Sequence, residues 1–333
     1  MIAKIFSATI VGLDAEIIEV EAGVSSGLTN TVIVGLPDTS VQESKERVKN
    51  AIRNSGSEYP VTRVSVNLAP ADLPKLGTHF DLPIALSIVL ASEQAVFSSA
   101  NKIFLGELSL DGKLRAVPGV LAVAMMAKAR GIKELYVPMD NAKEAGLVGG
   151  INIFPARDLK QILEHLTGIK PMQAKIPADY SEILQNITTI LDMKDVSGQE
   201  LAKRALEIAA AGGHNVLLSG PPGSGKTLLA RAMSGILPDL AVEEVLELTK
   251  IYSIAGRLSG NFISSRPVRS PHHTTSSVAL VGGGAVPRPG EITLSHRGIL
   301  FMDEFPEFPR NVLEALRQPL EDGVVTVARA SGS

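Results

Sequence analysis

Hydrophobic and polar residues alternate at the start of the chain. Within residues 3–23 (AKIFSATIVGLDAEIIEVEAG), isoleucine and valine alternate with glutamate at positions 18–21. A period of two is typical of a half-buried β-strand. The pattern predicts two strands that meet in a turn at residues 12–14, and the apolar run NTVIVGLP (residues 30–37) predicts a buried third strand.

The spacing then changes to that of a helix in SVQESKERVKNAIRNSG (residues 40–56). Ser40 and Glu43 match the pattern of a capping box, in which two side chains satisfy the first free N–H groups of a helix. Glu43 and Arg47 have the i,i+4 spacing of an ion pair, and Gly56 marks the end. We therefore predict a helix that begins with a capping box between Ser40 and Glu43.

Strand and helix patterns continue to alternate up to residue 168. The expected elements are strands at 63–70, 133–138 and 151–155, helices at 81–92, 119–131 and 158–167, and a hairpin with its turn at Asp111 and Gly112. The alternation predicts a mixed α/β domain over residues 1–168. Residues 169–190 begin with two prolines and no periodicity, which indicates a linker.

A second domain is predicted over residues 191–333. A helix at 199–213, a strand at 215–220, a glycine-rich loop and a helix at 226–237 follow in the order that begins a parallel α/β sheet. VALVGGGAVPRPGEITL (residues 278–294) predicts a glycine-rich, exposed hairpin. Near the end, VVTVARA (residues 324–330) predicts a strand that runs into a Ser-Gly turn.

The composition limits the kinds of functional site that this chain can carry. The 333 residues carry 32 Lys and Arg against 35 Asp and Glu, a net charge of -3, and no cysteine. No global basic field indicates a nucleic-acid partner, although a local basic patch is compatible with this balance. The lack of cysteine excludes disulfides, zinc–thiolate sites and thiol nucleophiles and favours a cytoplasmic location. Neither a signal peptide nor a membrane span is expected.

The segment GPPGSGKT matches the phosphate-loop pattern G-x-x-x-x-G-K-[ST] at every position. Its residues are Gly220, Pro221, Pro222, Gly223, Ser224, Gly225, Lys226 and Thr227. In this motif the glycines let backbone N–H groups face a phosphate, the lysine reaches the β- and γ-phosphates, and the hydroxyl binds Mg²⁺. We predict that this loop binds ATP together with Mg²⁺.

The segment GILFMDE (residues 298–304) supplies the second half of a nucleotide site. Its four apolar residues, 299–302, predict a buried strand that ends in Asp303 and Glu304, at the edge where α/β sheets bind ligands. Asp303 is expected to hold Mg²⁺ through water, and Glu304 to polarise the attacking water as the catalytic base. Many strands end in solvated acids, so this assignment depends on the phosphate loop.

Three other sets of residues carry weaker hypotheses. Val196 and Gly198 in DVSGQ are expected near an adenine, or the segment is a plain helix start capped by Ser197. His272 and His273 are a poor metal pair, because neighbours in sequence point apart on a strand or helix; a polar loop is favoured. In the first domain, Ser87 lies among apolar residues, which favours a packed side chain over a nucleophile.

Five long segments together resemble the ComM/YifB family of magnesium-chelatase-like AAA+ ATPases. They are GLPDTSVQESKERVKNAIRNSG, RVSVNLAPADLPKLGTHFDLPIAL, GELSLDGKLRAVPGV, GQELAKRALEIAAAGGHNVLLSGPPGSGKT and RPVRSPHHTTSSVALVGGGAVPRPGEITLSHRGILFMDE. The resemblance covers essentially the whole chain. It implies an α/β fold class: a Lon-protease-like (ribosomal-protein-domain-like) α+β N-terminal domain followed by a partial AAA+ P-loop α/β domain.

The same resemblance implies a function. The better-understood members of the family are hexameric DNA motors that drive branch migration during recombination of incoming DNA. The expected activity is therefore ATP hydrolysis coupled to helicase work in recombination and natural transformation, with DNA as a partner and a homo-hexamer as the assembly.

The likeness to Lon proteases fails at the catalytic dyad. In PKLGTHFD, His79 stands where the resemblance places the catalytic serine, and in LRAVPGVLAVAMMAKARGI, Leu121 stands at the place of the lysine. Both the nucleophile and its activator are missing. The resemblance therefore carries no peptidase activity to this chain.

The last residues resemble only part of a motor. EDGVVTVARASGS is similar to the first arm of the hairpin before the sensor-1 strand, and family members continue with the sensor-1 asparagine, the arginine finger and the helical lid. We therefore expect a truncated motor with slow ATP turnover. Arg329 is expected to contact the DNA backbone; a solvated arginine, or one paired with Glu321 or Asp322, is the alternative.

Two other functions remain open. A metal chelatase motor, which drives Mg²⁺ into a porphyrin, shares the AAA+ core, but chelatase motors are not expected to carry a Lon-like domain. No porphyrin partner is therefore expected. The other alternative is a scaffold that binds ATP without hydrolysing it, because parts of the motor that sense the γ-phosphate are absent.

Overall fold

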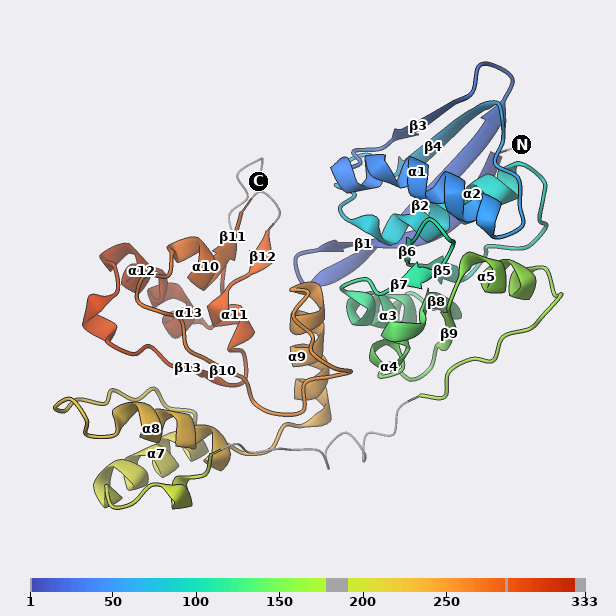
Figure 1. Ribbon diagram of the computed structural model, residues 1–333. Coiled ribbons are helices and arrows are strands. Elements are labelled where there is room, and N and C mark those ends of the chain that lie inside the picture. Colours follow the sequence, from blue (N-terminus) through green and yellow to red (C-terminus); the bar gives the residue numbers. More distant parts are fainter. Residues whose placement is uncertain (1, 178–190, 285–286, 327–333) are drawn as a thin grey trace. The chain divides into compact units, whose positions relative to one another are not determined.

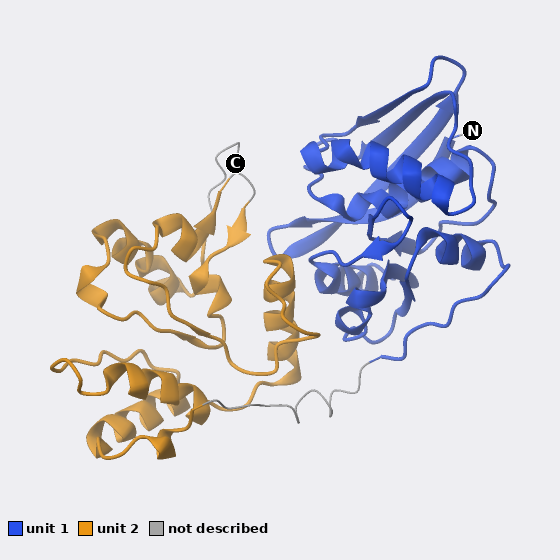
Figure 2. Cartoon of the chain, viewed as in Figure 1, with its two compact units in different colours: residues 1–178 blue, residues 179–333 orange. Residues whose placement is uncertain are grey.

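The computed structural model describes residues 2–177, 191–284 and 287–326, and its helices and strands are drawn in Figure 1. The chain divides into two compact units, residues 1–178 and 179–333 (Figure 2). This division falls inside the segment expected to be the linker. In the part of the chain that is described, no helix has the length and hydropathy of a membrane span.

A four-stranded sheet is the central layer of unit 1 (Figure 1). In the order β1-β2-β4-β3, its strands are β1 (Ile2–Val11), β2 (Asp14–Ser25), β4 (Arg63–Ala69) and β3 (Asn30–Val34). Strands β3 and β4 are parallel, and the other pairs are antiparallel. The predicted turn between β1 and β2 is confirmed, since Val11 faces Asp14. Ile18 and Val20 point into the core as their alternation predicts.

Helices α1 (Thr39–Asn54) and α2 (Asp81–Ala91) lie across this sheet (Figure 1). Helix α2 packs against β1, β2 and α1, and nearly all of its side chains are buried. That environment explains why its sequence is apolar all round instead of amphipathic. Helix α1 is amphipathic and buries one stripe that includes Val41, Val48 and Ile52.

The predicted capping box of α1 is wrong. The N-cap is Asp38, whose extended backbone precedes the helix and whose carboxylate accepts the Val41 N–H at 2.8 Å. Ser40 donates its hydroxyl to the same carboxylate at 2.7 Å. An aspartate two residues upstream was available to satisfy the first turn, so the helix begins at Thr39 and Ser40 lies within it.

A second, parallel sheet completes unit 1. Its strands are β5 (Lys102–Phe104), β8 (Glu134–Pro138) and β9 (Asn152–Ala156), and its helices are α3 (Val120–Ala129), α4 (Ala142–Ala145) and α5 (Leu159–Leu166). The strand register aligns Phe104, Tyr136 and Phe154, whose rings stack with centroids 4.6 and 5.0 Å apart. The predicted hairpin is confirmed as β6 (Glu107–Leu108) and β7 (Leu114–Arg115), which flank its turn.

The first residues of the expected linker pack on unit 1. The Met172 N–H donates to His165 Nδ1 at 2.9 Å, and Lys175 forms an isolated β-bridge with Ile153. These contacts attach residues 172–175 to α5 and β9. Residues 178–190 lie outside the described part of the chain.

Unit 2 is mainly helical in its described residues. Its helices are α7 (Glu200–Gly212), α8 (Lys226–Ala232), α9 (Val242–Ile254), α10 (Ser277–Val281), α11 (Glu291–Leu294), α12 (Arg310–Ala315) and α13 (Arg317–Asp322). Strands β10 (Val268–Arg269) and β13 (Ile299–Leu300) pair in parallel. The predicted glycine-rich hairpin is confirmed as β11 (Gly282–Gly283) with β12 (Arg288–Pro289).

Two expected strands of unit 2 differ from the prediction. Residues 215–219 are irregular, and the Leu217 side chain is 83% exposed. Only two residues of the expected strand at 299–302 form β13, and all four are half-buried. A parallel strand needs a neighbouring strand to pair with its N–H and C=O groups. Of the two expected strands, only β13 has such a neighbour among the described residues. Residues 324–326 form no strand, and Arg329 lies outside the described residues.

A buried ion pair joins the elements of unit 1. Arg47 Nε donates to Asp81 Oδ2 at 2.7 Å and Arg47 Nη2 donates to Oδ1 at 3.1 Å, while the Leu108 N–H donates to Oδ2 at 3.1 Å. Burial raises the pKa of Asp81 to about 6, against the opposing effect of Arg47 and the Leu108 amide. The carboxylate is therefore ionised at neutral pH and ties α1, α2 and β6 together.

We predict that Asp81→Asn destabilises unit 1 by about 3 kcal/mol, because it leaves the Arg47 guanidinium without its counter-ion. Amide hydrogen exchange across α1 and α2, followed by mass spectrometry, should accelerate by roughly 100-fold. Asp140→Asn is the matched control, since the Asp140 side chain is exposed. Equal exchange rates in the two variants would show that the ion pair does not stabilise the unit.

Candidate functional site

The glycine-rich loop of unit 2 lies between irregular residues 215–219 and helix α8. Gly223 and Gly225 have φ angles of 75° and 85°, in a region where a Cβ atom costs free energy. Gly225 is the N-cap of α8 and offers the helix no side-chain cap. The first N–H groups of α8 therefore begin directly at a loop whose path requires glycine.

Two polar side chains of this loop face its own backbone. Lys226 Nζ donates to the carbonyl oxygens of Gly220 and Pro221, at 2.9 Å each. The Ser224 hydroxyl is buried and has no hydrogen-bond partner among the described residues. An ammonium group held only by neutral carbonyls, beside a hydroxyl with unused bonding capacity, is able to bind an anion.

A side-chain hydrogen bond connects the loop to the acids after β13. The Thr227 hydroxyl donates to Asp303 Oδ2 at 3.0 Å, although the two residues are 76 positions apart. Asp303 Oδ1 accepts the N–H of Glu304 at 3.0 Å. The structure thus brings together the predicted metal-binding residues, Thr227 and Asp303, in one place with the loop lysine nearby in sequence.

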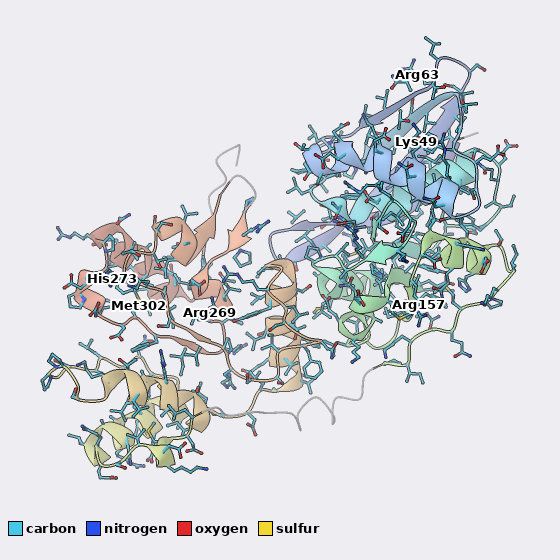
Figure 3. All side chains as sticks on the ribbon, in the orientation of Figure 1. Lys49, Arg63, Arg157, Arg269, His273 and Met302 are labelled. Atoms are coloured by element: carbon cyan, nitrogen blue, oxygen red, sulfur yellow. The ribbon has the colours of Figure 1, made fainter. Side chains whose placement is uncertain are left out.

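Glu304 is the residue expected to act as the base. Its backbone is left-handed, with φ of 54°, which is uncommon for a residue with a Cβ atom. Its Oε2 lies 3.2 Å from His273 Nδ1. Figure 3 labels His273, together with Met302, which lies two residues before Glu304.

An apolar cluster supports the end of β13. Leu280, Phe308, Val312 and Leu316 form its buried core, and Leu300 and Met302 pack against it. The cluster draws on α10, α12 and the segment after Glu304. Asp303 and Glu304 therefore follow a strand whose end is fixed by apolar packing before and after these two residues.

The expected adenine residues lie beside the loop. Val196 is buried and packs in a cluster with Leu229 and Ala232 of α8, and Gly198 is left-handed with no atom close to its Cβ position. The Gln199 side chain donates to the Ser224 carbonyl oxygen at 3.2 Å. The alternative of a cap by Ser197 is wrong, because Gln199 is the N-cap of α7. An adenine contact at Val196 and Gly198 stays a prediction.

The predicted polar loop is confirmed, because His272 and His273 lie in an irregular segment. The alternation of a strand does not apply there, and the two ring centroids are 4.1 Å apart. Among the residues that the structure describes, no group of three or more possible metal ligands occurs. The sequence analysis did not predict the contact of His273 with Glu304, because the pairing of β10 with β13 brings the two residues together.

His79 and Leu121, at the positions where the family resemblance places a catalytic dyad, are both buried in unit 1. Burial lowers the pKa of His79 to about 4, and its Nε2 donates to the Ala8 carbonyl at 2.9 Å. Leu121 is fully buried. The Ser87 hydroxyl is buried and donates to the Ile84 carbonyl, as the prediction of a packed side chain requires. None of the three side chains is available to attack a substrate.

Two protein families match this chain in sequence. Residues 192–333 match the family described as "Magnesium chelatase, subunit ChlI", and residues 20–141 match "Subunit ChlI of Mg-chelatase". Both units therefore carry sequence of the magnesium-chelatase-like class.

Individual relatives identify the branch of this class. The chain is 48% identical over 324 residues to the uncharacterized protein YifB of Escherichia coli, covering 96% of this chain and 62% of YifB. It is 43% identical over 337 residues to the competence protein ComM of Haemophilus influenzae, covering 99% of this chain and 65% of ComM. The chain belongs to the ComM/YifB family of magnesium-chelatase-like proteins. It spans less than two thirds of the length of these relatives.

A weaker similarity relates part of the chain to Lon proteases. Lon protease 2 of Bacillus subtilis is 28% identical over 150 residues, which cover 43% of this chain and 27% of the protease. The described fold is a mixed α/β fold with parallel strand pairs in both units.

We predict that unit 1 has no serine-hydrolase chemistry, because His79 and Leu121 occupy the dyad positions and both are buried. A fluorophosphonate probe should leave the segment from Met1 to Gly168 unlabelled, with a serine protease as the positive control. Labelling at one site that a single serine-to-alanine substitution removes would contradict this prediction.

Proposed function

We propose that this chain is the nucleotide-binding part of an AAA+ ATPase that works on DNA. The observation that carries the proposal is the hydrogen bond between Thr227 and Asp303, which joins the phosphate loop to the acids after β13. These two motifs are far apart in sequence, and their combination is what an ATPase of this type requires. Membership of the ComM/YifB family supports the same reading.

The residues present fit ATP and Mg²⁺. Gly223 and Gly225 supply the left-handed backbone of the loop, and the Ser224 hydroxyl is buried with bonding capacity left over. A hydroxyl and a carboxylate side by side, as in Thr227 and Asp303, are oxygen ligands of the kind that Mg²⁺ prefers. Bound Mg²⁺-ATP would supply the transferable phosphoryl group and the divalent charge.

Each side chain then has a defined task. Lys226 exchanges its neutral carbonyl partners for phosphate oxygens, which are stronger acceptors for an ammonium group. Thr227 and Asp303 would hold the cation, and backbone N–H groups of residues 220–225 would bind the phosphates. Glu304 would accept a proton from the water that attacks the γ-phosphorus, while the bond from that phosphorus to the ADP leaving group breaks.

The more specific proposal is that ATP hydrolysis drives work on DNA. One relative is named a competence protein, and the family resemblance implies branch migration during recombination by a homo-hexamer. The net charge of -3 is compatible with a local DNA-binding surface and gives no general affinity for nucleic acid. A cytoplasmic location follows for a protein with this task.

Chelation of a metal is the second candidate, favoured by the descriptions of both matching families. It would use the same ATP site to drive Mg²⁺ into a porphyrin. Against it stands the similarity of part of the chain to Lon proteases, which we expect in the ComM/YifB branch and not in a dedicated chelatase motor.

We predict opposite defects for two substitutions in the site. Lys226→Ala should weaken ATP binding by roughly 10- to 100-fold, because it removes a charged donor from the ground state. Glu304→Gln should keep ATP binding and lower turnover by about 10²- to 10⁴-fold, because it removes only the base. Equilibrium binding of a fluorescent ATP analogue and phosphate release measure the two effects.

Lys194→Ala and Glu307→Gln are the matched controls. Lys194 is an exposed lysine of the same unit, and Glu307 is an exposed glutamate three residues beyond Glu304. Both should behave as the unsubstituted protein. Normal turnover in Glu304→Gln would remove Glu304 as the base, and absence of saturable ATP binding in the unsubstituted protein would overturn the proposed function.

The partner can be tested separately. We predict that DNA raises the rate of ATP turnover and that a porphyrin with Mg²⁺ leaves it unchanged. The stimulation should weaken as salt increases, because contacts with the phosphate backbone are electrostatic. Stimulation by porphyrin, with formation of the metallated product, would favour the chelatase instead.

A further inference from the structure

Strands β10 and β13 place His273 and Glu304 at corresponding positions. The two strands are parallel, and Arg269 pairs with Leu300. His273 comes four residues after Arg269, and Glu304 comes four residues after Leu300. Because the carboxyl ends of parallel strands meet at one edge, this register alone brings the histidine loop to the predicted base.

The histidine loop is anchored independently of Glu304. Pro271 at its start is buried. At its end, Ser276 caps helix α10 by accepting the Ala279 N–H at 3.2 Å, and Leu280 of that helix is fully buried in the cluster behind β13. His273 is therefore presented from a fixed support, with its side chain 31% exposed.

The Glu304 side chain is more exposed than that of His273, at 65%. Among the described residues its carboxylate contacts His273, with 3.2 Å between Nδ1 and Oε2. The left-handed backbone of Glu304 fixes where its side chain leaves the turn. A glutamate has three side-chain torsions, so a hydrogen bond formed across this 3.2 Å separation would restrict the place of its carboxylate.

We infer that His273 is a positioning residue for Glu304: its Nδ1–H donates to the carboxylate and holds the base at one place in the site. The inference rests on the proposed function, in which Glu304 is the base. A neutral imidazole suffices, because Nδ1–H is a donor in that form when the proton stands on this nitrogen. His273 acts through Glu304 and contacts no nucleotide itself.

The neighbouring histidine has a different role. His272 is exposed, and its Nδ1 lies 3.0 Å from the Thr274 hydroxyl and 3.3 Å from the Thr274 backbone nitrogen. The His272 ring also lies 4.1 Å from the His273 ring, so His272→Ala would disturb His273. The control is Thr274→Ala, which changes an exposed residue of the same loop.

Two substitutions distinguish the position of the donor. In His273→Asn, the amide nitrogen can take the place of Nδ1, because both atoms are two bonds from Cβ. In His273→Gln, the amide nitrogen is one bond further out. The inference predicts that kcat is higher in His273→Asn than in His273→Gln, and lowest in His273→Ala.

The first readout does not require turnover. In ¹⁵N spectra of the histidine side chains, the His273 ring should carry a proton on Nδ1. Glu304→Ala should move this proton to Nε2. A His273 ring that is protonated only on Nε2 in the unsubstituted protein would overturn the inference.

The second readout is turnover. His273→Ala should lower kcat about 10-fold, the scale of a hydrogen bond to a charged group, and leave both KM and ATP binding unchanged. His273→Asn should recover most of kcat. In a Glu304→Gln background, His273→Ala should have no further effect, because the base through which it acts is gone.

The outcomes separate the inference from the proposed function. A His273→Ala variant with normal kcat, while Glu304→Gln is inactive, overturns only the inference. Loss of ATP binding in His273→Ala would place the histidine in the nucleotide pocket and also overturns it. If Glu304→Gln itself turns over normally, the proposed base is wrong and the inference falls with it.

Discussion

The candidate site depends on one hydrogen bond, from the Thr227 hydroxyl to Asp303. A phosphate loop alone binds phosphate, and acids at a strand end alone are solvated groups. Joined, they combine an ammonium group, a hydroxyl and two carboxylates in a few residues. The bond itself is weak, but the apolar cluster behind β13 holds Asp303 and the packing of α8 holds Thr227. The site is thus assembled by two separate cores that meet through polar contacts.

Unit 1 buries the side chains at the two positions where the family resemblance places a catalytic dyad. The positions of the expected dyad are filled by His79, which is neutral and bonded to a carbonyl, and by Leu121, which is buried. The buried Asp81 carboxylate is paired with the Arg47 guanidinium. These contacts connect two helices and a hairpin, so the ion pair stabilises the unit.

Sequence predicted what depends on local pattern and failed where the outcome depends on distant partners. The hairpin after Val11 follows from alternation and turn residues, and the amphipathic helix α1 follows from its helical spacing. The cap of α1 was misplaced because Asp38 competed with Ser40 for the same N–H groups. Residues 215–219 have a strand-like pattern, but a strand also needs a ladder partner. The contact between His273 and Glu304 depends on the register of β10 and β13, which no local signal encodes.

The central claim is that the two motifs form one site for Mg²⁺-ATP. It is tested most directly by determining the structure of this chain with Mg²⁺ and a non-hydrolysable ATP analogue. The account predicts that Lys226 leaves the Gly220 and Pro221 carbonyls for the β- and γ-phosphates. It also predicts that Mg²⁺ lies between the Thr227 hydroxyl and Asp303. A nucleotide bound elsewhere, or a cation held without Thr227 and Asp303, would contradict it.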